Sequence, residues 1–420
     1  MQNLKRRLFL KATAASVTAA MMASSVMAAD PIVLGVPTAQ SGPVGVADQQ
    51  DWLNGVTLAV EEINASGGVN GRMIETKVVD IDILTPEGTV AAFQNLSESG
   101  VHAIASSFVL IPQPAMDAAA ATGVPYLHGN TQTASLDLFK TDPQKYRNTF
   151  MIDVAETWYG SGFIKFLSQL KASGQWVPKN NKVHIVQEQI AYTQVISQAT
   201  QDAIAASGGE WELGGITDIQ FPVQDWSPVM RALKQSDAGV IMIDHWVAAE
   251  LASFTQTFAV DPVEGALVYL QYGPSQPEFL DLAGEMANGF IWGSVIGTYN
   301  DEMGAAFRDT YQARFPGTMG MVYTGSGYDT AKLLAQVWTT TDPGDFDAVG
   351  DAIRNVKYRG VAGAYTFDND TQSGTSYPNQ TDDPEAGQAH LIFQVQDGEH
   401  RIISPAPFGE VDFEPAWWMQ

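Results

Sequence analysis

The stretch "DWLNGVTLAVEEINASGGVNGRMIETKVVDID", residues 51–82, contains a complete passage from helix to strand. Apolar residues recur in its first half at spacings of three and four, which predicts one buried face of a helix: Leu53, Val56, Val60 and Ile63. Gly67 and Gly68 supply left-handed conformations that end the helix, and Asn70-Gly71 turns the chain into the next strand. The stretch therefore predicts the corner of a right-handed strand–helix–strand unit.

The same alternation extends along most of the chain. The run "PIVLGVP" at 31–37 is continuously apolar, as expected of a strand buried on both faces. Further strands are expected at 73–82, 101–109, 124–129, 182–188, 238–246, 266–273 and 289–297. Helices are expected at 86–99, 112–123, 193–206, 247–259, 277–287, 301–314, 326–340 and 345–355. A second series starts near residue 156, so the pattern predicts an α/β protein with parallel central sheets in two lobes.

The end of the chain departs from this alternation. "GAYTFDND" and "HLIFQVQDGEHRIIS" predict strands, the second forming a hairpin that turns at Asp397-Gly398. Residues 404–420 lie beyond the alternating pattern, and we expect Trp417 and Trp418 to dock this tail on the second lobe.

Composition limits the function classes. The chain has 420 residues, 45% of them hydrophobic, which is enough for two or three domains with sizeable cores. A net charge of −25 without any stripe of Lys or Arg argues against binding of nucleic acid or anionic lipid. The absence of cysteine excludes thiol catalysis, thiolate metal sites, disulfides and a lipoprotein anchor.

The first 28 residues have the features of an export signal. Arg6-Arg7 followed by Leu8-Phe9-Leu10-Lys11 resembles the twin-arginine signal, and Val26-Met27-Ala28 suits signal peptidase, with cleavage after Ala28. The apolar stretch 12–23 is too short to span a membrane. The sequence therefore predicts a soluble periplasmic protein.

Residues 32–82 resemble the opening of the leucine/isoleucine/valine-binding family, the type I periplasmic substrate-binding proteins of ABC importers. The resemblance rests on Ser41-Gly42-Pro43 after the first strand, the corner "AVEEINASGGVNGR" and the acidic end of the second strand. It continues through "GVHAIASSFVLIPQPAMDAAAATGVPYL", "EQIAYTQ", "GSGYDTAKLLAQVW" and "HLIFQVQDG", and so covers nearly the whole mature chain.

The resemblance implies two Rossmann-like lobes joined by three hinge crossings, with a ligand in the cleft between them. The crossings would fall near 153–156, 297–299 and 388–392. Lobe 1 would comprise 30–154 and 298–389, lobe 2 would comprise 155–297 and 390–403, and the tail 404–420 would pack on lobe 2. The implied function is capture of a small molecule by lobe closure and its delivery to an ABC permease and its ATPase.

Ligands of open parallel sheets bind beyond the carboxyl ends of the strands. In lobe 1 this rule selects loop residues after the first, third and fourth strands: Ser41, Ser107, Phe108, Val109, His128, Asn130 and Thr131. In amino-acid-binding relatives the last two loops hold the ligand carboxylate. Here Phe108-Val109-Leu110 occupies the position where relatives offer a serine, which weakens the assignment of a carboxylate.

The other candidates follow the first crossing or the strands of lobe 2, apart from one acid in the "GYDTA" motif: Glu156, Trp158, Tyr159, Tyr192, Trp246, Tyr272 and Asp329. Tyr192 matches the family's cleft tyrosine. The acid that pairs with the ligand ammonium in relatives is missing from "QYGPSQPE", unless Glu278 reaches back; Glu156, Asp244 and Asp329 are the alternatives. We expect a ligand with an apolar or aromatic part and a polar end: an amino acid, an amide or an aromatic carboxylate.

Two other classes of function bear on this sequence. An enzyme is disfavoured because the sequence has neither a Gly-x-Ser-x-Gly elbow nor a His-Glu-x-x-His pair, and we expect no metal or cofactor. A ligand sensor with the same fold stays open, since fold alone does not separate sensing from transport.

Overall fold

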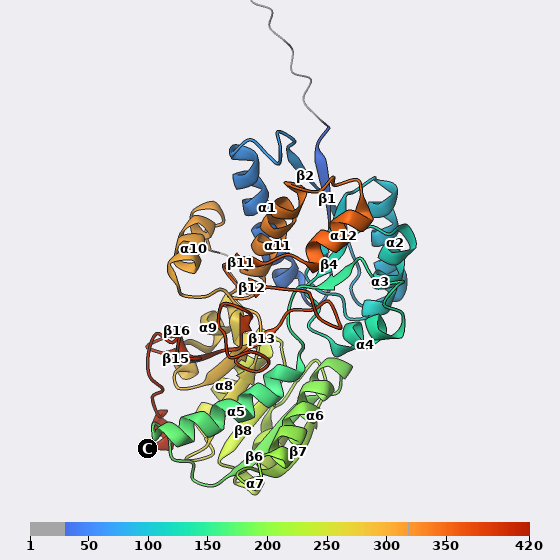
Figure 1. Ribbon diagram of the computed structural model, residues 1–420. Helices are drawn as coiled ribbons and strands as arrows, with labels where there is room; N and C mark the ends of the chain where they lie inside the picture. Colours follow the sequence, from blue (N-terminus) through green and yellow to red (C-terminus); the bar gives the residue numbers. More distant parts are fainter. Residues whose placement is uncertain (1–29, 318) are drawn as a thin grey trace, which may run out of the picture.

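The computed structural model describes residues 30–317 and 319–420, and it has two α/β lobes (Figure 1). The export-signal prediction concerns residues outside this range. The first lobe contains a parallel sheet of order β2-β1-β3-β4-β5, built from β1 (Ile32–Thr38), β2 (Ile74–Asp80), β3 (Ala103–Ser106), β4 (Tyr126–His128) and β5 (Thr149–Met151). Its helices are α1 (Val46–Ala65), α2 (Pro86–Glu98), α3 (Pro112–Thr122), α4 (Thr133–Thr141), α10 (Glu302–Arg314), α11 (Tyr323–Trp338) and α12 (Phe346–Arg354).

The second lobe contains a seven-stranded sheet of order β16-β15-β10-β9-β8-β6-β7. Its parallel strands are β6 (Lys182–Glu188), β7 (Glu212–Ile219), β8 (Val240–Asp244), β9 (Leu267–Gln271) and β10 (Ile291–Ser294). The hairpin β15 (Leu391–Gln396) and β16 (Glu399–Ser404) adds two antiparallel strands. The helices are α5 (Thr157–Ser173), α6 (Ala191–Ala206), α7 (Ser227–Ser236), α8 (Ala248–Val260) and α9 (Pro277–Ala283), with short 3₁₀ turns η1 (Gly273–Ser275), η2 (Gly284–Ala287) and η3 (Trp417–Met419).

The chain passes between the two sheets three times, which confirms the predicted fold class. It leaves the first sheet after β5, returns to the first lobe with α10 to α12, and re-enters the second sheet at β15 (Figure 1). Two small ladders precede this last passage: β11 (Tyr358–Gly360) with β12 (Gly363–Tyr365), and β13 (Ser376–Tyr377) with β14 (Gln388–Ala389). The individual lobe boundaries stay a prediction.

The corner at 64–72 has the predicted geometry. Gly67 and Gly68 adopt φ of 98° and 72°, and the Gly68 N–H donates to the Ile63 carbonyl at 2.9 Å. Val69 and Arg72 then exchange backbone hydrogen bonds of 2.8 and 2.9 Å, which turns the chain into β2. The helix before the corner is longer than predicted, because it begins at Val46, directly after Gly45 in a left-handed conformation.

Several elements were missed or overextended by the sequence patterns. β7 is an edge strand with two glycines and mostly exposed side chains, so it lacks an apolar run, and only Val229, Met230 and Leu233 of α7 are buried. The short elements α4 and β5 were also missed. The strand expected at 101–109 ends at Ser106, and the strand of "GAYTFDND" is limited to β12.

The C-terminal tail contacts the second lobe through one of its two tryptophans. The Trp418 ring is 1% exposed and its Nε1 donates to the Ala266 carbonyl at 2.8 Å, while Trp417 is 57% exposed. The Phe290 ring lies 4.8 Å from the Trp418 ring. In the part of the chain that the structure describes, no helix combines the length and apolar character needed to cross a membrane.

α1 and α11 cross at backbone contact distance, and this crossing fixes the site-bearing ends of both helices. A Cβ atom at Gly55 would lie 2.1 Å from the Thr324 carbonyl oxygen, and one at Gly327 would lie 2.3 Å from the Trp52 carbonyl oxygen. Both distances are shorter than any real Cβ contact, so only glycine permits the crossing.

We therefore expect Gly55→Ala and Gly327→Ala to lower the free energy of unfolding by about 1–3 kcal/mol or more, because the helices must separate. Gly344→Ala is the matched control, since a Cβ there meets nothing closer than 3.5 Å and should change stability by less than about 0.5 kcal/mol. Urea unfolding of the three variants measures this. Equal effects at all three positions would contradict the close crossing.

Candidate functional site

A pocket lies where the carboxyl ends of the two sheets meet. The first lobe contributes residues from α1, from the loops after β3 and β4, and from the start of α11: Asp48, Phe108, Leu110, Asn130, Thr131, Gln132 and Tyr323. The second lobe contributes residues from α5 and from the segments after β6, β8, β9 and β10: Tyr159, Ile190, Tyr192, Trp246, Tyr272 and Ile296.

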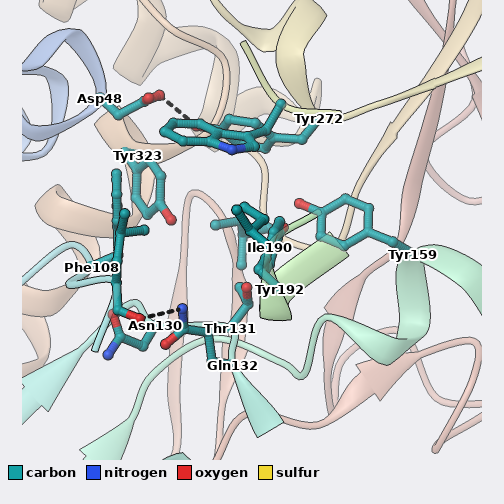
Figure 2. Close-up of a pocket in the computed structure, with 13 residues that line it drawn as sticks. Asp48, Phe108, Asn130, Thr131, Gln132, Tyr159, Ile190, Tyr192, Tyr272 and Tyr323 are labelled. Atoms are coloured by element: carbon teal, nitrogen blue, oxygen red, sulfur yellow. Dashed lines mark hydrogen bonds between the residues drawn. The ribbon is translucent and has the colours of Figure 1, made fainter. Parts of the chain in front are cut away.

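Seven of the residues expected from the sequence line this pocket: Phe108, Asn130, Thr131, Tyr159, Tyr192, Trp246 and Tyr272. Aromatic rings from both lobes lie close to one another at the seam between the lobes. The Phe108 ring lies 5.4 Å from that of Tyr323 and 6.4 Å from that of Trp246, and the Tyr272 ring lies 6.2 Å from that of Tyr323. Figure 2 shows Phe108, Tyr323, Tyr272 and Tyr159 around the same space.

The remaining lining residues were not among the candidates: Asp48, Leu110, Gln132, Ile190, Ile296 and Tyr323. Leu110 and Gln132 belong to loops that the strand-end rule had already selected. Asp48 was not among the candidates because the apolar spacing that predicts the helix begins only at Leu53, so the position did not stand out as a helix start next to the first strand. Tyr323 likewise precedes the start predicted for its helix at 326.

Asp48 is the acidic residue of the pocket, and it links the two lobes. Its side chain is 5% exposed, and its Oδ1 accepts a hydrogen bond of 2.5 Å from the Tyr272 hydroxyl and another from the Gln276 amide. Burial, with a smaller contribution from the nearby Asp51 carboxyl, raises the pKa of Asp48 to about 7. Asp51 accepts from the Gly320 N–H at 2.9 Å, and burial raises its pKa to about 6.

Tyr272 reaches Asp48 from an unusual backbone conformation. Its φ of 58° and ψ of −52° lie outside the regions that L residues normally occupy. The backbone is held by hydrogen bonds from the Tyr272 N–H to the Gly293 carbonyl at 3.2 Å and from the Ser275 N–H to the Tyr272 carbonyl at 2.8 Å. Strain of this kind persists where the surrounding structure fixes it, and it is common at binding sites.

Three polar atoms of lining residues have no protein partner. The Asn130 Oδ1 accepts from the Val109 N–H at 2.7 Å, but the Asn130 Nδ2 has no hydrogen-bond partner among the described residues. The Trp246 Nε1 and the Gln132 Oε1 also lack a partner among these residues. The Tyr192 hydroxyl accepts from the Gln271 amide at 3.1 Å. Two donors and one acceptor on residues that line the pocket are therefore unpaired within the described part of the chain.

Four predicted residues of lobe 1 do not line the pocket. Ser41 is exposed, and its hydroxyl donates to Asp80 at 3.3 Å. Ser107 is fully buried, and the Val109 side chain packs in the hydrophobic core at 1% exposure. His128 is buried beside the Tyr126 ring, and burial lowers its pKa to about 3, so it is neutral.

Three further candidates have structural partners instead. Glu156 accepts hydrogen bonds from the N–H and the hydroxyl of Thr133 at 2.6 and 3.0 Å, which fixes the start of α4. Trp158 is half-buried and packs against the core. Asp329 accepts from the backbone N–H groups of Val361 and Ala362, each at 2.8 Å, so it anchors the loop between β11 and β12. None of the four carboxylates considered as partners of a ligand ammonium lines the pocket, namely Glu156, Asp244, Glu278 and Asp329; Asp48 does.

An aromatic cleft formed jointly by the ends of two α/β sheets defines a two-lobed binding protein for small molecules. The model of the periplasmic binding protein family matches residues 31–380. The chain therefore belongs to the periplasmic binding protein family and has the solute-binding role of that family.

Solved structures agree with this assignment. A structure from Silicibacter pomeroyi, assigned to a branched-chain amino acid ABC transporter, is 32% identical, with a TM-score of 0.87 over 93% of this chain and 100% of that chain. Two others share the fold at lower identity. LivJ from Streptococcus pneumoniae in complex with isoleucine is 18% identical, with a TM-score of 0.70 over 89% of this chain and 100% of that one. A solute-binding protein from R. palustris in complex with benzoate is 14% identical, with a TM-score of 0.69 over 89% and 96%. No curated protein sequence matches the chain.

Asp329→Asn tests whether this residue has a structural role. We expect it to lower the free energy of unfolding by about 1–3 kcal/mol, because the amide nitrogen cannot accept the buried N–H of Val361 or Ala362. Asp137→Asn, an exposed acid on α4, is the control and should leave the thermal midpoint unchanged. Equal thermal midpoints for the two variants would rule out the anchoring role.

Asp48 also predicts a pH dependence. Its pKa rises from 3.8 to about 7 on folding, so between these values the folded chain holds a proton that the unfolded chain has released. Stability of the ligand-free protein therefore falls as pH rises through this window. In Asp48→Asn the decrease in stability per pH unit near pH 6 should be smaller, by the contribution of about one titrating proton. Thermal midpoints from pH 5 to 8 measure this, and an identical slope in both proteins would contradict it.

Proposed function

We propose that the chain is the periplasmic solute-binding component of an ABC importer, which captures a small organic ligand by lobe closure and delivers it to a permease and its ATPase. The observation that carries this proposal is the shared construction of the pocket. Seven lining residues come from the first lobe and six from the second, so neither lobe forms the site alone. The hydrogen bond from Tyr272 to Asp48 supports closure, because it joins the lobes beside the pocket.

The ligand expected from the lining has an apolar or aromatic body and a polar end. Isoleucine bound to LivJ and benzoate bound to the R. palustris protein are ligands of this kind in proteins of the same fold. The proposal includes an export signal of twin-arginine type at 1–28, cleaved near Ala28, and no lipid anchor. It involves no catalytic step and no nucleic acid. Within the described residues no cluster of His, Asp or Glu could hold a metal ion.

The test combines titration calorimetry with small-angle scattering on the mature chain. The panel contains isoleucine, phenylalanine, leucinamide, choline and benzoate. We expect at least one member to bind and to reduce the radius of gyration. Failure of every bound ligand to compact the protein would refute the closure mechanism.

Trp246→Ala should weaken binding of that ligand by about thirtyfold or more, because the ring forms one wall of the pocket. Trp417→Ala removes an exposed tryptophan of the tail and should leave affinity unchanged. Calorimetry of both variants with the same ligand makes the comparison. Equal affinities would show that the ligand binds elsewhere.

A further inference from the structure

The pocket holds one carboxyl group, Asp48, and its lining contains no basic side chain. None of its thirteen lining residues is Lys, Arg or His. Both hydrogen bonds that Asp48 accepts end on Oδ1, and no described residue donates to Oδ2. The neighbouring groups around Asp48 are Tyr272, Gln276 and a second carboxyl, Asp51. An unpaired buried carboxylate is costly, and a ligand that brings a positive charge removes that cost.

Aromatic rings surround the same space. Phe108 lies close to both Trp246 and Tyr323, and Tyr272 lies close to Tyr323 and donates to Asp48. Figure 2 shows Asp48 beside the rings of Tyr272 and Tyr323. Ring faces attract cations, and a cage of several rings with one carboxylate is a typical site for an ammonium group.

The remaining polar atoms suit a neutral group better than a second charge. The Asn130 Nδ2 and the Trp246 Nε1 are donors on lining residues without partners among the described residues, and a carbonyl or hydroxyl oxygen is the kind of ligand group that would satisfy them. A ligand carboxylate would meet no cationic side chain in the lining and would lie in the field of Asp48 and Asp51. Burial of a ligand carboxylate without a cationic partner and close to two acidic groups is unfavourable.

We propose that the ligand of this cleft is a small organic cation, an ammonium group on an apolar body with one uncharged oxygen-bearing group, and that Asp48 pairs with the ammonium inside the aromatic cage. This inference rests on the proposed solute-binding function and narrows it. It selects amino amides and amino alcohols over amino acids and aromatic carboxylates.

The test compares ligands that differ in one charge. Calorimetry on the mature wild-type chain uses leucinamide against leucine, and choline and benzoate as the cationic and anionic extremes. We expect leucinamide to bind at least about tenfold tighter than leucine, because the carboxylate is replaced by a neutral amide. Choline should bind measurably and benzoate should not.

Asp48→Asn should weaken leucinamide binding by about thirtyfold or more, because it removes one partner of a buried charge pair. Asp137→Asn removes the same charge from an exposed site on α4 and should have no effect. The comparison of ligands on the wild-type protein decides the proposal even where Asp48→Asn fails to fold.

The outcomes separate this inference from the proposed function. If leucine or benzoate binds more tightly than leucinamide and compacts the protein, the inference of a cationic ligand is refuted and the solute-binding function stands. Equal binding of leucinamide by wild type and Asp48→Asn also overturns it. Absence of binding and of compaction with every ligand refutes both.

Discussion

Parallel strands all end at the same edge of their sheet, and in this chain both sheets turn that edge towards one seam. Asn130 follows β4 of the first sheet, while Tyr192, Trp246 and Tyr272 follow β6, β8 and β9 of the second. The pocket forms where these loops meet. Its composition is therefore set by short loop sequences, while its shape is set by how the two lobes dock.

Several carboxyl groups are buried close to the seam. Asp48 and Asp51 lie on α1, and Asp153, in the first crossing between the sheets, accepts from the Ser326 hydroxyl at 3.1 Å. Burial raises the pKa of Asp153 to about 7, as it does for Asp48. Burial without a compensating charge favours the protonated form of each acid. A cationic ligand would relieve the cost of ionisation at Asp48, which lines the pocket, and would leave it at Asp153, which does not.

Several local features could be predicted from the sequence. The corner at 64–72, the hairpin turn at Asp397-Gly398 and the loops at strand ends depend on nearby residues, and the structure has all three. Properties that depend on docking could not be predicted. Glu156 and Asp329 have the residue type expected of an ammonium partner, yet both are occupied by backbone N–H groups distant in sequence. Asp48 becomes part of the pocket because Gly45 starts α1 early and because Tyr272 reaches it from the other lobe.

The second lobe holds its side of the pocket rigidly. A Cβ atom at Gly273 would lie 3.0 Å from the Trp246 carbonyl oxygen and 2.5 Å from the Leu251 side chain, so the loops after β8 and β9 pack backbone against backbone. This packing places Trp246 and Tyr272 relative to each other and maintains the positive φ of Tyr272. A pre-formed wall loses little conformational entropy when a ligand binds. In this structure Asp48 and Phe108 of the first lobe already lie against that wall, through the hydrogen bond from Tyr272 to Asp48 and the contact between the Phe108 and Trp246 rings.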